Sequence, residues 1–425
     1  MSSRDASCTR REFVAKPLTY MAMASLLGSG KESSQAGTLR ALDSAPTPKL
    51  ITRPLGKTGI TLPIVSMGVL NVEAPGLIIR AWEAGIRHFD TAAVYQEGRN
   101  EETLGLAMRR LGVRDEVVIG TKAPIHGLSA RTTGERTAAE TKADALRSFE
   151  GSLKRLQVER VAIFYLHEIH DSRAVDDLGV QAAMTQLKKE GRILATGVSA
   201  HECQADVLNA VARSGFWDLA LVAFNYAMSE NQAMLDAMKL CASKGIGIIA
   251  MKTQVGGTER DGWWLEPPPK ASRHEVFANG RQKSVRNSAV LKWVLQHPFV
   301  TTAVPGITAF EHIDQDIGAA IDLAYTDDEH EFISNNSIKA SLEFCHQCRD
   351  CVASCPNLVD IPSLMRSHMY AFQYHNLDHA RFTLARAPEG EGLDVCKSCT
   401  GCVAHCSHTV NIKHKVEALK TIRLG

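Results

Sequence analysis

Several features that would narrow the class of this chain are missing from it. Its 425 residues contain no uninterrupted apolar run of about 18 residues, so we expect no membrane-spanning helix and no integral membrane protein. The formal net charge is only +1, which gives no reason to expect nucleic acid as a partner. A glycine-rich G-x-G-x-x-G turn is absent after the first candidate strand, which counts against a Rossmann domain.

Cysteine is scarce before residue 345 and concentrated after it. Eight of the eleven cysteines form two copies of one pattern, Cys345-x-x-Cys348-x-x-Cys351-x-x-x-Cys355 and Cys396-x-x-Cys399-x-x-Cys402-x-x-x-Cys406. Three thiolates on one tight loop can hold three irons of a cubane cluster, while the fourth is free to bind the neighbouring cluster. Crossed ligation would therefore give one cluster Cys345, Cys348, Cys351 and Cys406, and the other Cys396, Cys399, Cys402 and Cys355.

Two other uses of these cysteines are possible. Disulfides need an oxidising compartment and typically staple a small domain, whereas here they would join only the tail of a large protein. Structural zinc usually takes four ligands from two Cys-x-x-Cys pairs. The repeat favours two [4Fe–4S] clusters over both.

The ends of the chain suggest three regions. Thr9-Arg10-Arg11-Glu12-Phe13-Val14 resembles the twin-arginine export motif, and the modestly apolar stretch Leu18 to Leu27 follows it. We expect export of the folded protein to the periplasm; the alternative is a chance arginine pair in a cytoplasmic protein. Because 425 residues exceed what one core usually supports, we predict a leader and linker over 1–48, a first domain over 49–335 and a cluster domain over 336–425.

The region from about Leu50 to Thr326 alternates short β-branched runs with longer amphipathic segments. The candidate strands are Ile64–Val69, Ile86–Asp90, Val117–Thr121, Val161–Leu166, Ile193–Ser199, Leu219–Phe224, Ile246–Met251 and Val300–Val304. Helical patterns cover Glu101–Leu111, Thr141–Leu156, Gln181–Glu190 and Gln232–Lys244, and Leu364 to Leu384 in the tail also reads as helical. Eight strand–helix units predict an α/β fold, a closed (β/α)8 TIM barrel, followed by a small α-helical ferredoxin-like two-cluster domain. Thr52 to Thr61 is expected to form a hairpin at the barrel floor.

Polar side chains stand at the ends of successive candidate strands. Asp90 ends the second strand, Lys122 the third and His167 the fourth, and Tyr95 follows Asp90 in the loop. Each alone could be a helix cap, a packing residue or a satisfied core histidine. Together they lie where barrel enzymes carry their chemistry, at the carboxyl ends of the strands.

These residues belong to blocks that resemble the signature of a known family. Ile86 to Tyr95, Gly120-Thr121-Lys122, Tyr165-Leu166-His167 and Gly197-Val198-Ser199 are similar to blocks of the aldo-keto reductases, in the same order. The tail, including Asp360-Ile361-Pro362, is similar to a bacterial branch that carries a cluster domain. The resemblance implies carbonyl and alcohol interconversion with NADPH or NADH. Tyr95 would be the acid, Lys122 would lower its pKa, Asp90 would keep Lys122 charged and His167 would orient the substrate oxygen.

The resemblance is weaker on the nucleotide side. It implies contacts from Ser199, Asn225, Met251, Gly306, Thr308 and His312. Met251 stands where a stacking aromatic is usual, His312 replaces an arginine and Asp316 an asparagine. A 2′-phosphate needs Arg or Lys, and the segment from Pro305 offers neither. NADH use, basic residues from elsewhere and weak nucleotide binding all stay open.

Other histidines and aromatics near these blocks are less informative. His201 and the run His167-Glu168-Ile169-His170 fall one residue short of a zinc-protease His-Glu-x-x-His, so we expect a surface position or a supporting role rather than a metal site. The loop Thr253 to Lys283, with Trp263 and Trp264, is expected to overhang the site.

The sequence thus predicts an oxidoreductase with a small carbonyl or alcohol substrate, coupled to or accompanied by two clusters that serve a redox partner protein. An alternative is an electron-carrier or docking subunit whose barrel no longer turns over nucleotide. A third possibility is that the clusters only staple the fold.

Overall fold

The computed structural model describes residues 49–128, 136–254, 285–335 and 343–422. The expected export motif and most of the loop Thr253 to Lys283, including both tryptophans, lie outside these residues. Among the helices described, none has the length and apolar character needed to cross a membrane.

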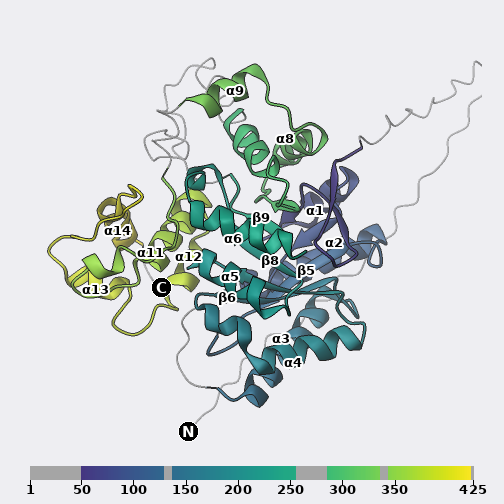
Figure 1. Ribbon diagram of the computed structural model, residues 1–425, viewed down its shortest axis with the longest axis horizontal. Helices are drawn as coiled ribbons and strands as arrows, with labels where there is room; N and C mark the ends of the chain where they lie inside the picture. The colour runs from purple at the N-terminus through teal and green to yellow at the C-terminus, as the bar shows by residue number, and fades with distance from the viewer. Residues whose placement is uncertain (1–48, 129–135, 255–284, 336–342, 423–425) are drawn as a thin grey trace, which may run out of the picture. The chain divides into compact units, whose positions relative to one another are not determined.

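Eight parallel strands form the expected barrel (Figure 1). They are β3 (Met67–Gly68), β4 (His88–Asp90), β5 (Val118–Ala123), β6 (Ile163–Ile169), β7 (Ala195–Ala200), β8 (Leu219–Ala223), β9 (Gly247–Met251) and β10 (Thr302–Val304). Neighbours in the sheet follow chain order from β3 to β10, and bridges from Val65 to Ala303 and from Gly68 to Gly306 join its two edges. The predicted (β/α)8 architecture is confirmed, although the first strand is much shorter than Ile64–Val69.

Helices cover the outside of the strands and begin and end at recognisable signals. They are α1 (Pro75–Glu83), α2 (Arg99–Leu111), α3 (Ala138–Leu156), α4 (Leu178–Lys189), α5 (Gln204–Ser214), α6 (Gln232–Ser243), α8 (Phe310–Ile321) and α9 (Asp327–Ser334), with a further helical stretch over 285–295. Short helices η1 (Tyr95–Gly98), η2 (Ser172–Asp176) and η3 (Tyr226–Met228) follow three of the strands. Thr137 and Glu140 form a capping box that starts α3, and Gly112 ends α2 at φ 72°.

The barrel floor is closed by the predicted hairpin. β1 (Thr52–Pro54) pairs with β2 (Thr61–Pro63) in antiparallel register. Leu55 and Leu62 pack with Ile163 and Tyr165 from inside the barrel, all fully buried. Because apolar side chains fill this end, any chemistry is left to the opposite end of the strands.

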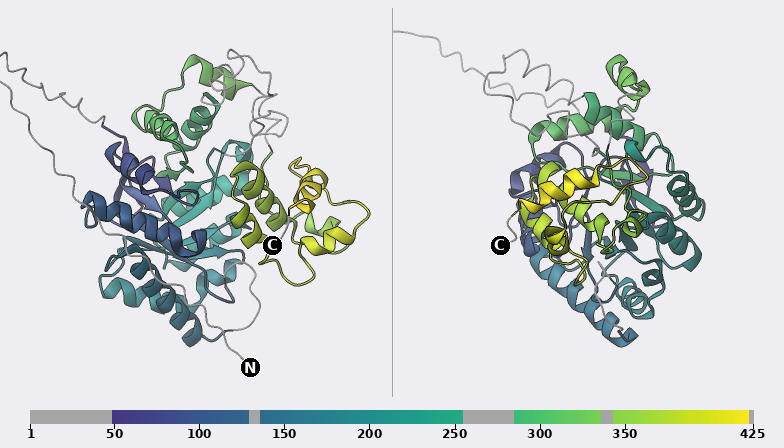
Figure 2. Two further views of the ribbon diagram at one scale, coloured as in Figure 1. Left: turned by 180° about the vertical axis from the view of Figure 1, so that it is seen from behind. Right: turned by 90° about the vertical axis from the view of Figure 1, so that its left-hand side faces the viewer.

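The tail is helical but not in one piece. It contains η5 (Val352–Ser354), α11 (Ile361–His368), the π-helical turn η6 (Met369–Gln373), α12 (Leu377–Leu384), α13 (Leu393–Ser398) and α14 (Ile412–Lys420). The expected helix Leu364 to Leu384 is broken because His375 takes φ 51° and Asn376 caps α12 by accepting from the His379 amide. Seen along the barrel, these helices lie in front of its ring of helices (Figure 2, right).

One pair of glycine substitutions tests the packing of α2 on α3. A Cβ at Gly105 would lie 2.3 Å from the Leu156 carbonyl oxygen, whereas one at Gly318 in α8 would meet no atom within 4 Å. We expect Gly105→Ala to lower the free energy of unfolding by about 1–3 kcal/mol through overpacking. Gly318→Ala should raise it by about 0.5–1 kcal/mol through helix propensity. Urea unfolding followed by circular dichroism measures both; equal effects would contradict the packing described.

Candidate functional site

The structure brings the four candidate acid–base residues together at the carboxyl ends of β4 to β6. The Lys122 ammonium donates to Asp90 Oδ1 and to the Thr91 carbonyl at 2.7 Å, and lies 3.4 Å from the Tyr95 hydroxyl. The His167 ring stands edge-on to the Tyr95 ring, with centroids 5.9 Å apart. Asp90, Lys122 and His167 are buried, and Tyr95 is half-buried.

The protonation of Tyr95 differs from the expectation. Burial first, and then the charges of Asp90 and Glu168, raise the pKa of Tyr95 well above its ordinary value. The resemblance implied a lowered pKa, but Lys122 is itself buried, which lowers its own pKa, and its charge is engaged by Asp90. The phenol of Tyr95 therefore keeps its proton at pH 7. Burial also lowers the pKa of His167 to about 3, so its imidazole is neutral at pH 7.

A bulge in β6 turns Glu168 toward the same end of the barrel as His167. Its register with β7 shifts between Leu166 and Ile169, and Glu168 takes φ 52° while its amide donates to Ser199 Oγ at 3.0 Å. Bulges next to active sites often serve to re-aim a side chain. The carboxylate is buried, and burial alone would raise its pKa. Electrostatic interactions with His167 and with the guanidinium groups of Arg386 and Arg366 instead lower it to about 2.

Glu168 stands beside His201, for which the sequence predicted a surface position or a supporting role. His201 is only 7% exposed, and its Nε2 lies 3.9 Å from Glu168 Oε1. Ligand atoms of His167, Glu168 and His201 lie within 4.8 Å of one another, a spacing open to a metal ion. Two cationic side chains border this group, Lys252 at 3.2 Å from His201 Nδ1 and Arg386 at 3.5 Å from Glu168 Oε2. They supply positive charge there without a metal.

The tail contributes side chains to the same end of the barrel. His379 of α12 is buried, and its ring lies edge-on to the Tyr95 ring, with centroids 5.9 Å apart. The His379 ring also lies edge-on to the Tyr370 ring, with centroids 4.3 Å apart. Lys252, at the end of β9, stands 5.4 Å from the centroid of the Tyr370 ring. Tyr95 is thus flanked by one histidine of the barrel and one of the tail.

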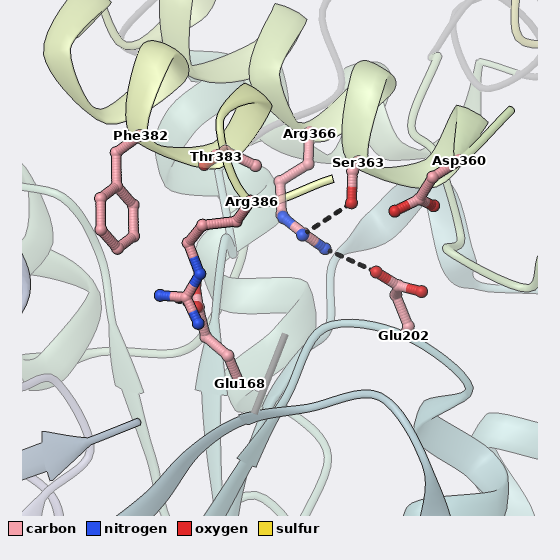
Figure 3. Close-up of a pocket in the computed structure, with 8 residues that line it drawn as sticks. All are labelled: Glu168, Glu202, Asp360, Ser363, Arg366, Phe382, Thr383 and Arg386. Atoms are coloured by element: carbon pink, nitrogen blue, oxygen red, sulfur yellow. Dashed lines mark hydrogen bonds and ion pairs between the residues drawn. The ribbon is translucent and has the colours of Figure 1, made fainter. Parts of the chain in front are cut away.

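Ion pairs join the tail to the barrel loops (Figure 3). Arg366 of α11 and Arg349 each approach Glu202 to 3.2 Å, and Arg349 also reaches Asp360 at 3.1 Å. Glu202 and Arg366 are almost fully buried, so each needs the other. We call Glu202, Arg349, Asp360 and Arg366 the docking cluster.

Two hydrogen bonds add to the docking cluster. The Asn376 amide donates to Asn71 Oδ1 at 2.7 Å, and the Cys203 amide donates to the Gln347 carbonyl at 3.2 Å. Sequence reasoning missed these residues and His379 because no local pattern reports which segments meet across two domains. Only the run from His167 to His170 drew attention to this region.

The expected nucleotide contacts are less well assembled. Ser199 and Asn225 are buried, Ser199 accepting from the Glu168 amide and Asn225 donating to the Lys252 carbonyl at 3.2 Å. Gly306 and Thr308 are exposed, and the Thr308 amide donates to His312 Nδ1 at 3.3 Å.

Between Pro305 and Asp316 the described segment carries three carboxylates and no lysine or arginine. The three are Glu311, Asp314 and Asp316. These side chains do not fit the phosphates of a dinucleotide, because phosphate binding favours Arg and Lys.

The eight cysteines of the tail collect into two groups. Cys355, Cys396, Cys399 and Cys402 line one cavity of about 40 Å3 with apolar neighbours that include Val359 and Val416. Cys345 is close enough to Cys348, Cys351 and Cys406 for their charges to help raise its pKa to about 12, after the larger effect of burial. Four thiolates in so small a space repel one another unless cations lie between them, so the donor set fits iron–sulfur clusters. The membership matches the crossed sets, which stay a prediction.

Barrel and tail together define the class of the protein, an oxidoreductase barrel joined to an iron–sulfur domain. The model of the aldo/keto reductase family matches residues 69–336, and that of the 4Fe-4S dicluster domain matches residues 337–407. The chain belongs to the aldo/keto reductase family.

Named relatives are dehydrogenases and reductases of small molecules. A D-threo-aldose 1-dehydrogenase of a Pseudomonas species is 31% identical over an alignment of 226 residues. The match covers 45% of this chain and 66% of that enzyme, just under two thirds of its length. L-galactose dehydrogenase of Arabidopsis thaliana is 23% identical over 69% of this chain and 95% of that enzyme.

Solved structures share the fold. An aldo-keto reductase from Bacillus halodurans superposes with a TM-score of 0.53 at 19% identity, covering 70% of this chain and 100% of that one. One from Klebsiella pneumoniae in complex with NADPH gives a TM-score of 0.50 at 24% identity, with coverage of 70% and 99%. At these identities the likeness establishes the barrel and nothing finer.

The buried neutral histidines predict acid sensitivity. Burial lowers the pKa of His167 to about 3 and of His379 to about 4. As pH falls below about 6.5, the unfolded chain takes up protons that the folded chain refuses. The free energy of unfolding should therefore fall by up to about 1.4 kcal/mol per pH unit for each histidine.

The contribution of one histidine can be isolated by substitution. Urea unfolding at pH 7, 6 and 5.5 should give a shallower pH slope for His379→Gln than for the unchanged chain. An identical slope in the two proteins would show that His379 is not held neutral.

Proposed function

We propose that this protein interconverts a small carbonyl compound and its alcohol at Tyr95, and that two [4Fe–4S] clusters in the tail connect this site to a one-electron partner protein. The observation that carries the proposal is the contact of His379 with Tyr95, because it sets the cluster domain directly on the acid–base residues. A tail that only stapled the fold would have no reason to reach this end of the barrel.

The residues of the barrel have distinct tasks in this reaction. Tyr95 donates its proton to the carbonyl oxygen as negative charge develops there, and the neutral His167 orients that oxygen. Lys122, held by Asp90, stands next to the hydroxyl and stabilises the phenolate left behind. When bound, the clusters would supply or accept electrons one at a time.

The described residues at the nucleotide side offer few partners for a phosphate. Since no Lys or Arg is found between Pro305 and Asp316, a 2′-phosphate lacks a partner there, which favours NADH over NADPH wherever a nicotinamide is used. The relatives' names, an aldose and a galactose dehydrogenase among them, support a small polar carbonyl or alcohol as the substrate class.

A second candidate function is an electron-carrier or docking subunit in which the barrel no longer turns over nucleotide. The segment from Pro305 to Asp316 favours it, because this segment offers no lysine or arginine to a phosphate. The assembled Asp90, Tyr95, Lys122 and His167 favour the enzyme. For location, we propose twin-arginine export to the periplasm, on the strength of Arg10 and Arg11 and the apolar stretch after them.

Removing one hydroxyl tests the reaction. We expect Tyr95→Phe to lower carbonyl reduction about 10²–10³-fold, because an oriented proton donor is lost. The assay follows reduction of glyceraldehyde, a small polar aldehyde, by the anaerobic, cluster-loaded protein with reduced methyl viologen or NADH as donor. Tyr325→Phe is the matched control, since the Tyr325 hydroxyl has no hydrogen-bond partner among the described residues. Unchanged turnover in Tyr95→Phe would contradict the assignment.

Paired cysteine substitutions test the crossed ligand sets. Cys355→Ala with Cys396→Ala removes ligands of one predicted cluster, so iron content should fall from about eight to about four atoms per chain. Cys355→Ala with Cys406→Ala removes a ligand from each, and both clusters should be lost or altered. Iron and sulfide analysis with electron paramagnetic resonance distinguishes the outcomes, and Cys241→Ala is the control. Uncrossed ligation would give Cys355 and Cys396 to different clusters, so loss of both clusters in the first pair would refute crossing.

A further inference from the structure

We infer that the docked cluster domain and a nicotinamide dinucleotide compete for the same end of the barrel, so that the docked protein does not bind NADH or NADPH. The inference rests on the proposed function, because it places a nicotinamide beside Tyr95 and next to Ser199 and Met251. It concerns the cofactor of that site rather than its carbonyl chemistry.

The tail and Lys252 take up the space beside Met251. Lys252 has φ 56°, which turns its side chain from the end of β9 toward the tail, where its ammonium meets the Tyr370 ring and His201. Tyr370 in turn contacts His379, and His379 contacts Tyr95. A continuous line of side chains from the tail therefore runs from the end of β9 to the acid–base residues.

Neither of the two cavities described where the tail meets the barrel is large enough for a nicotinamide ring. Lys252 shares one of about 30 Å3 with Cys345, Gln347 and Arg366, and Glu168 shares another of about 10 Å3 with Arg386. Such volumes hold a water molecule or two. Sites for cofactors and other ligands are usually about 300–1,000 Å3.

The barrel segment that would face the dinucleotide phosphates, from Pro305 to Asp316, offers them no lysine or arginine. Asp314 pairs with Arg80 at 2.8 Å, and Asp316 is buried and accepts from Gln254 at 2.7 Å. Glu311 is the one acidic residue on the first turn of α8, where its charge opposes the attraction that a helix N-terminus has for phosphate.

Paired charges join the tail to the barrel where the tail would compete with a nucleotide. Arg366 and Glu202 of the docking cluster are each under 10% exposed, and each is the buried partner of the other. Arg386 and Glu168 add a second contact between tail and barrel. A nucleotide that takes this space has to displace the ion pairs between tail and barrel.

The electrons that reduce the carbonyl in the docked protein must then come from a one-electron donor, such as a small iron–sulfur or flavin protein. Each carbonyl reduced takes up two electrons and two protons.

Equilibrium binding to the intact, cluster-loaded chain tests the competition. NADH fluorescence and calorimetry with NADH and NADPH should show no saturable binding to the unchanged protein up to about 1 mM, which corresponds to a free energy weaker than about −4 kcal/mol. The double variant Glu202→Gln with Arg366→Gln removes both charges of the buried pair. It should gain saturable binding, with an affinity at least about tenfold higher.

Two further variants make the test decisive. Tyr370→Ala opens the space beside Lys252 without touching an ion pair, and should also gain binding if the double variant fails to fold. Asp236→Asn with Lys239→Gln removes an exposed pair on α6 and should gain none. Saturable binding by the unchanged protein would overturn the inference, and so would absence of binding in both opened variants. Neither result bears on the loss of turnover in Tyr95→Phe, which tests the proposed function separately.

Discussion

The ion pair between Arg366 and Glu202 is the contact on which the rest of the arrangement depends. One side chain comes from the first helix of the tail and the other from the loop after β7, and both are buried. A buried charge is tolerated only when its partner is present, so this pair holds the two parts in one relative position. Cys345 reaches the cavity beside Lys252, and His379 reaches Tyr95, only because that position is kept.

Docking also changes the electrostatics of the barrel. Burial favours the neutral form of three side chains at this site. It raises the pKa of Tyr95 and lowers the pKa of Lys122 and of His167. Arg366 and Arg386 of the tail offset this for one group, Glu168, which is held as a carboxylate. Residues of both domains thus set the charge state at this end of the barrel, and an isolated barrel would lack those of the tail.

Much of this could be predicted from the sequence, and the limits have physical causes. Period and length of the apolar runs placed all eight strands, because a buried parallel sheet leaves that signature in each strand. The candidate acid–base residues were singled out because they follow strand ends; the structure brings them together, and their roles stay a prediction. The bulge at Glu168 and the break at His375 were not predicted, since both depend on positive φ values that non-glycine residues adopt only under tertiary constraint. The lowered pKa expected for Tyr95 was wrong because it considered Lys122 without the burial of the whole group. Contacts such as His379 with Tyr95 join residues almost 300 positions apart, beyond any local pattern.

The central claim is that the tail's clusters sit against the acid–base end of the barrel. Redox titration monitored by electron paramagnetic resonance tests it most directly, on the unchanged protein and on Lys252→Met. Burial and Arg366 lower the pKa of Lys252 to about 7, so at pH 6 this side chain is a positive charge beside Cys345. Its removal should lower the reduction potential of one cluster, on the order of tens of millivolts, and leave the other unchanged. Identical potentials for both clusters in the two proteins would contradict the docking of the clusters on the barrel.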